Sequence, residues 1–237
     1  MSAGHATAVS PVRAVVVVLA LTVAALAASI AVGVAVIVPA AFLEYDVFSL
    51  PVQVAALVAG QLGFFAVGYL YASRHDIRVP ISWPTGRSVG YVVVGTPLAL
   101  LVAAGGIALL EVLDVMPDSV IEETAVLDPV FLLALAVLSV VLVAPVEEYL
   151  FRGVVQGRLR ESLGPVAAIL VASLLFGAMH FANYTGSPVQ ILAGVLLVTS
   201  VGIVLGAVYE LTDNLTVPIL VHAIYNVVLL VPAYFAL

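Results

Sequence analysis

Long apolar runs constrain this chain more than any other feature of its sequence. A helix needs about 20 mostly apolar residues to cross a bilayer, and seven stretches reach or approach that length. They are residues 14–42, 50–72, 89–110, 130–150, 165–181, 189–208 and 215–235. In lipid, a spanning segment must satisfy its backbone hydrogen bonds internally. The sequence therefore predicts an all-α fold, a polytopic transmembrane helix bundle of about seven spans.

The composition excludes several other classes of protein. Of the 237 residues, 64% are hydrophobic and 9% are charged, whereas roughly a quarter of the residues in soluble domains are charged. The chain has no cysteine, which excludes disulfides and thiolate metal sites. It has no basic patch of the kind that binds nucleic acid. We expect one integral membrane domain over residues 1–237, a multi-pass protein of the plasma membrane in contact with the lipid bilayer.

The charged residues predict the orientation of the bundle. All seven basic residues are arginines: Arg13 before the first span, Arg74, Arg78 and Arg87 between the second and third, and Arg152, Arg158 and Arg160 after the fourth. With seven spans these positions fall on one side of the membrane, and the hydrophilic loop 111–128 falls on the other. Since loops rich in arginine stay in the cytoplasm, the N-terminus is predicted to be cytoplasmic.

Two acids and a base come directly after the uncharged apolar run 130–144 of the fourth span, in the sequence Glu147-Glu148-Tyr149-Leu150-Phe151-Arg152. Ionised side chains inside a span are costly and usually face the protein interior or a water-filled cavity. On a helix, Glu148 and Arg152 share a face in the favourable acid-before-base order, while Glu147 points elsewhere. One carboxylate is therefore paired, and the other is free to act as a general base.

Polar side chains also occur in the fifth and seventh spans. His180 follows Phe176 by four residues, and Asn226 follows His222 by four, so each pair shares a helix face. Because the seventh span begins near Leu215, His222 and Asn226 are expected at a shallower depth than the acids, unless the preceding loop dips into the membrane. Each feature taken alone is also explained by a helix-end ion pair or by a hydrogen bond between packed helices.

The spacing of the spans predicts how these groups meet. If the fourth and fifth spans form a hairpin that turns at residues 162–164, Glu147 and His180 lie at nearly the same distance from the turn. Pro145 and Pro218 precede the ionisable residues and are expected to kink their helices. We expect the polar groups to line one wet cavity that opens toward the arginine-rich face.

Three motifs together resemble a known family. Glu147-Glu148-x-x-x-Arg152, Phe176-x-x-x-His180 and His222-x-x-x-Asn226 are similar, in order, to the three motifs of the CPBP intramembrane proteases, also called the Abi family. That family comprises CAAX proteases and bacteriocin-processing enzymes and includes the type II CAAX prenyl endopeptidases. The resemblance covers residues 140–228, the expected protease core, and does not extend to the first three spans.

The resemblance implies an intramembrane endopeptidase that hydrolyses peptide bonds of membrane-associated substrates. It assigns Glu147 as the base that activates water, with the help of His180. His222 and Asn226 are expected to hold the oxyanion, and Arg152 is expected to pair with Glu148 and fix the motif helix. An amide NH2 group suits this oxyanion role because it donates without ionising.

Several alternatives stay open at this point. A catalytic zinc ion held by Glu147, His180 and His222 has the right number of protein ligands, but no His-Glu-x-x-His helix is present, and we favour metal-free hydrolysis with no certain cofactor. A non-catalytic membrane scaffold or immunity-type protein on the same fold is one rival function. A proton-coupled transporter is another, because intramembrane Glu and His residues also form proton relays.

The substrate is not specified by the sequence. A prenylated C-terminal CAAX motif is the best-known target of the resembled family, but no segment of this chain encodes recognition of a lipid or of a particular peptide. We expect the partner to be a peptide or protein at the membrane, with or without a lipid attached.

Overall fold

The structure, a computed structural model, describes residues 10–237; residues 1–9, which the single-domain prediction included, lie outside the described residues. Within residues 10–237, seven helices are long and apolar enough to cross a membrane, which confirms the predicted all-α polytopic bundle. The chain is a multi-pass integral membrane protein. Five spans are single helices: α1 (Pro11–Phe42), α2 (Leu50–Arg74), α3 (Arg87–Val112), α9 (Pro188–Thr212) and α10 (Thr216–Ala236).

The fourth span is longer than predicted and runs from Val130 to Leu163. It consists of α5 (Val130–Leu138), η1 (Ser139–Val143), α6 (Ala144–Glu148), η2 (Tyr149–Gln156) and α7 (Gly157–Leu163), and its η segments are π-helical. Pro145 lies just after η1 and has no backbone N–H for the regular ladder, so the helix widens at this point and continues. The two acids thus occupy one α-helical turn between two π-helical segments, which are rare and often mark functional sites.

A tight turn joins the fourth span to the fifth. Gly164 has a φ of +76°, a left-handed conformation that glycine adopts without a steric penalty. Pro165 follows as the first residue of α8 (Pro165–Met179), which ends in the 3-10 segment η3 (His180–Asn183). The prediction of a hairpin that turns at residues 162–164 is confirmed.

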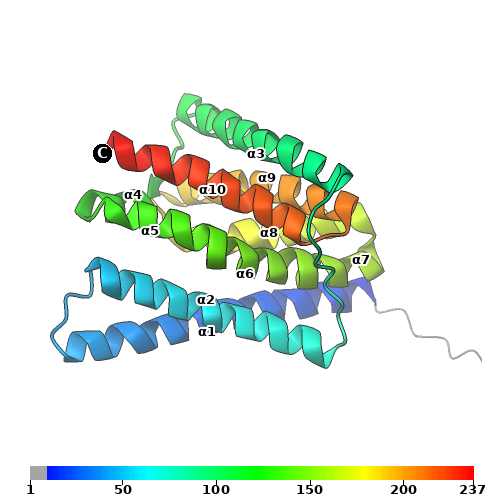
Figure 1. The fold of residues 1–237 in the computed structure, drawn as a ribbon, viewed down its shortest axis with the longest axis horizontal. Helices are drawn as coiled ribbons and strands as arrows, with labels where there is room; N and C mark the ends of the chain where they lie inside the picture. Colours follow the sequence, from blue (N-terminus) through cyan, green and yellow to red (C-terminus); the bar gives the residue numbers. More distant parts are fainter. Residues whose placement is uncertain (1–9) are drawn as a thin grey trace, which may run out of the picture.

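The other spans are arranged around the fourth span, Val130–Leu163. Figure 1 shows the α1–α2 hairpin along one side of the bundle and α3 along the opposite side, with the remaining spans between them. One apolar cluster joins the hairpin to the fourth span and α8, through residues such as Leu150 and Phe151. A second cluster joins α3, α9 and α10, through residues such as Val208 and Val221.

The helix ends that carry arginines lie together. Figure 1 shows the start of α1, the end of α2, the start of α3 and α7 at one end of the bundle, and the C-terminus at the other. The arginines thus stand at one end of the bundle, as the sequence analysis predicted when it used them to orient the chain. The orientation in the membrane itself stays a prediction.

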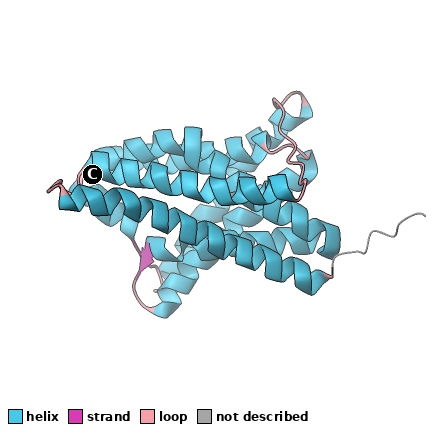
Figure 2. Ribbon diagram, turned by 90° about the horizontal axis from the view of Figure 1, so that it is seen from below, coloured by secondary structure: helices cyan, strands magenta, loops and turns pink. Residues whose placement is uncertain are grey.

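The hydrophilic segment 111–128, which we expected to be a loop, contains regular secondary structure. It contains β1 (Asp118–Ser119) and α4 (Val120–Leu127), and β1 pairs antiparallel with β2 (Tyr184–Thr185). The Ser119 hydroxyl accepts a hydrogen bond from the Glu122 backbone N–H at 3.4 Å, which caps α4. The two strands lie at the end of the bundle where the C-terminus lies (Figure 2).

The kink expected at Pro218 is absent. The helix α10 begins at Thr216, so Pro218 lies in its first turn. The backbone N–H groups of a first turn have no partner within the helix, and a proline there removes no hydrogen bond. The same residue therefore helps to start the helix.

The contact of α8 with α9 depends on a glycine next to the Phe176 motif. A Cβ atom at Gly177 would lie 2.6 Å from the Val195 carbonyl oxygen and 2.9 Å from the Thr199 backbone nitrogen. Both are backbone atoms of α9, which cannot rotate away as a side chain does. The close approach of these helices thus requires glycine.

We predict that Gly177→Ala lowers the free energy of unfolding by about 1–3 kcal/mol, because overpacking must push the two helices apart. Thermal unfolding of the purified protein in detergent measures this change. Gly105→Ala in α3 is the matched control, since a Cβ there would meet no atom within 4 Å. Equal unfolding temperatures for the two variants would contradict the described packing.

Candidate active site

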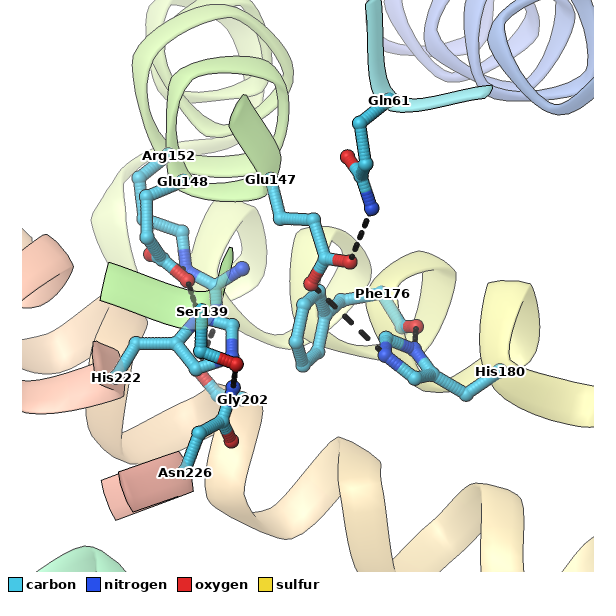
Figure 3. A network of polar contacts seen from close by, with 10 residues as sticks. All are labelled: Gln61, Ser139, Glu147, Glu148, Arg152, Phe176, His180, Gly202, His222 and Asn226. Carbon is cyan, nitrogen blue, oxygen red and sulfur yellow. Dashed lines mark hydrogen bonds and ion pairs between the residues drawn. The ribbon is translucent and has the colours of Figure 1, made fainter. Parts of the chain in front are cut away.

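A cavity of about 570 Å³ lies between the α1–α2 hairpin and the other spans. Glu147, His180, His222 and Asn226 all contribute to its wall. The structure therefore brings four of the six predicted site residues, from three different spans, to one hollow (Figure 3). The other two predicted residues, Glu148 and Arg152, lie behind the wall.

Arg152 and Glu148 form an ion pair inside the bundle. The Arg152 Nε atom lies 3.2 Å from Glu148 Oε2, and both side chains are fully buried. The guanidinium also donates a hydrogen bond to the Gly202 carbonyl at 2.9 Å and lies 4.7 Å from the centroid of the Phe176 ring. These contacts correct one expectation: Arg152 is an interior residue and not one of the arginines at the membrane surface.

His222 joins this pair. Its Nδ1 atom lies 2.9 Å from Glu148 Oε1, so His222 reaches the level of the motif, and the shallower position expected for it is wrong. An ionised carboxylate only accepts hydrogen bonds, so Nδ1 carries the hydrogen. Nearby, one N–H of the Asn226 amide donates a hydrogen bond to the Ser139 hydroxyl at 3.3 Å. The second N–H of the same amide group does not take part in this bond.

His180 faces the other acid. Its Nδ1 atom lies 2.7 Å from the Phe176 carbonyl oxygen, and because a carbonyl only accepts, Nδ1 carries the hydrogen. The Nε2 atom then faces Glu147 Oε2 at 3.9 Å. This separation is too long for a direct hydrogen bond. The predicted meeting of Glu147 and His180 is confirmed in position.

Glu147 has a different environment from Glu148, although the two are adjacent. Glu147 is 5% exposed, and its Oε1 atom accepts a long hydrogen bond of 3.5 Å from the Gln61 amide. Its Oε2 atom accepts no hydrogen bond from any residue in the range 10–237. The carboxylate next to the ion pair thus keeps one oxygen without a hydrogen-bond donor among the described residues, at the wall of the cavity and on the side of His180 (Figure 3).

Sequence reasoning missed the polar residues that support these groups. Gln61 comes from α2, in the part of the chain without a motif, and Ser139 comes from the apolar part of the fourth span. The sequence did hold a signal for Gln61: Gln53 and Gln61 are polar residues of an apolar span, eight residues apart and on one helix face. Both line the cavity.

The direction in which the cavity was expected to open is wrong. From Glu147 its wall continues through Gln53, Ile121, Asn183 and Tyr184, which lie toward the end of the bundle opposite the arginines. Within the described part of the chain, residues 148–175 contribute no wall residue. The side chains of Leu150, Phe151, Val154, Val155 and Leu159 are fully buried and fill that region.

The zinc alternative does not fit the arrangement of these side chains. In the range 10–237, no group of three or more His, Cys, Asp or Glu side chains is placed to hold one metal ion. Glu147, His180 and His222 are therefore not arranged as the ligand set of that alternative.

Residues 129–228 match the family model for the type II CAAX prenyl endopeptidase Rce1-like family. A relative from Bacillus subtilis (strain 168), named "Uncharacterized protein YpbD", is 37% identical over 87 residues, which are 37% of this chain and 39% of the relative. No solved structure matches the chain. The matched region contains all three motifs, and Glu147, His180, His222 and Asn226 of the cavity wall lie within it.

Proposed function

We propose that this protein is an intramembrane endopeptidase that hydrolyses a peptide bond of a membrane-associated substrate. One observation carries the proposal. The uncommitted Glu147 oxygen and the His180 Nε2 atom face each other at 3.9 Å in a cavity, inside the region that matches an endopeptidase family. A water molecule between the two atoms would be held in a fixed position for attack on a carbonyl group.

In the proposed first step, Glu147 removes a proton from this water as a general base. The water oxygen forms a bond to the carbonyl carbon of the substrate, and the carbonyl oxygen becomes an oxyanion. His180 accepts a hydrogen bond from the same water through Nε2, since its Nδ1 hydrogen is held by the Phe176 carbonyl. In the second step the carbon–nitrogen bond breaks, and the proton on Glu147 passes to the leaving amine.

We propose that Asn226 and His222 stabilise the oxyanion. Asn226 has a second amide N–H beyond the one that bonds to Ser139, and preorganised donors of this kind lower the barrier to acyl transfer. His222 can donate through Nε2 only when both ring nitrogens carry hydrogens, because Nδ1 is engaged with Glu148. Glu148 and Arg152 act as positioning residues, since neither lies in the cavity wall.

The substrate is proposed to be a peptide or protein segment at the membrane, and the enzyme is proposed to act in the plasma membrane. Apolar residues such as Leu57, Phe131 and Leu135 form much of the wall around the polar groups. Such a wall suits apolar side chains of a peptide. Whether the substrate carries a lipid is a separate question that substrate profiling addresses.

We predict that Glu147→Gln, and separately His180→Ala, reduce cleavage at least about 100-fold, which is the lower range for loss of acid–base catalysis. Peptides released from membranes that contain the native protein or the variant are compared by mass spectrometry. The matched control is Glu161→Gln, which makes the same chemical change at an exposed ion pair with Arg158.

All variants should insert and unfold at nearly the native temperature. A membrane scaffold is supported instead if the Glu147 and His180 variants keep the phenotype of the native protein. A transporter is supported if proteoliposomes accumulate a solute while no peptide is cleaved.

We predict a different result for Arg152→Met. Removing one partner of a buried ion pair leaves a charge without compensation and costs roughly 3–5 kcal/mol. The variant should therefore lose both thermal stability in detergent and cleavage, whereas Glu147→Gln loses cleavage alone. A stable, active Arg152→Met protein would contradict the positioning role.

A further inference from the structure

The cavity reaches only one end of the bundle. Its wall begins at Glu147 and continues to Gln53 near the start of α2, Ile121 in α4, and Asn183 and Tyr184 after α8. These residues lie at the ends of their elements that are remote from the arginines, and Tyr184 belongs to the paired strand β2. Asn183 and Tyr184 are half-buried. We take these two residues as the mouth of the cavity.

The path from Glu147 toward the opposite end is filled. The side chains of Leu150, Phe151, Val154 and Leu159 are fully buried in the cluster formed by α1, α2, α8 and the fourth span. Gln156 is 1% exposed and donates a hydrogen bond to the Gly206 carbonyl at 3.1 Å. A packed interior leaves no passage for a peptide in this direction.

Charge distinguishes the two ends. Apart from the buried Arg152, the arginines stand at the filled end: Arg13, Arg74, Arg78, Arg87, Arg158 and Arg160. The end with the mouth has acidic residues in the segment 111–128, which holds no basic residue. Because arginine-rich ends of membrane proteins stay in the cytoplasm, the predicted orientation places this end of the cavity on the opposite side of the membrane.

We propose that the substrate reaches Glu147 from the extracytoplasmic face. The substrate class is then an exported peptide, or the extracytoplasmic segment of another membrane protein, that enters the cavity with apolar side chains. A C-terminal motif exposed only in the cytoplasm does not have access. The assignment of a substrate rests on the proposed peptidase function, but the side from which the cavity is reached does not.

Cysteine accessibility tests the proposal, and the native chain is a clean background because it has no cysteine. Four single variants are compared: Asn183→Cys at the mouth, Leu135→Cys in the wall, and Thr85→Cys and Ser162→Cys at the arginine-rich end. A small membrane-impermeant thiosulfonate is applied to intact cells and, separately, to permeabilised cells. The extent of labelling is read by mass spectrometry of the purified protein.

The first two cysteines should react in intact cells, and the other two only after permeabilisation. Labelling of Leu135→Cys only from the cytoplasmic side, or from neither side, overturns the proposal. This readout needs no catalysis, so a failure of the peptidase function would leave the labelling pattern unchanged.

A second measurement links the accessible cavity to cleavage. In cells that release a Glu147-dependent peptide, the Leu135→Cys variant should lose release on external labelling, relative to the same variant before labelling, because the adduct occupies the cavity. Labelling of Ser162→Cys in permeabilised cells should leave release unchanged. Unchanged release after complete labelling of Leu135→Cys would show that the substrate does not use this route.

Discussion

The buried Arg152 guanidinium is the constraint on which the rest of the site depends. A charge inside an apolar bundle is tolerated only with partners on every side. Here Glu148 supplies the counter-charge, α9 supplies the Gly202 carbonyl and Phe176 supplies an aromatic face. Since His222 binds the other oxygen of Glu148, one charge fixes the relative positions of the fourth, fifth, sixth and seventh spans.

Because of this constraint, the adjacent carboxylates Glu147 and Glu148 have different environments. Glu148 uses both oxygens in the interior network, whereas Glu147 keeps one oxygen without a protein partner among the described residues. The two acids are consecutive residues of one α-helical turn, so their side chains point to different surfaces of the same helix. The buried ion-pair network thus lies beside a second carboxylate that has fewer protein partners.

The filled half and the open half of the bundle differ in how closely the α1–α2 hairpin packs on the other spans. Around η2 and α7, the hairpin α1–α2 packs closely on the fourth span through small and apolar residues such as Ala14, Val18 and Gly68. Toward the acidic end, the space between the hairpin and the other spans is lined by Gln53, Gln61 and apolar side chains and stays open. Access to the polar groups is therefore one-sided, and the side is set by packing and not by the motifs.

The sequence by itself determined the membrane class, the seven spans, the hairpin turn and the three pairs of motif residues. These follow from local rules: apolar length, helical spacing, and the conformations of glycine and proline. Only the tertiary structure decided that Arg152 lies inside the bundle, that His222 binds Glu148, that Gln61 and Ser139 join the site, and that the cavity opens away from the arginines. The physical reason is that burial and cavity shape depend on contacts between spans far apart in sequence. A residue's own helix does not reveal which neighbour fills the space beside it.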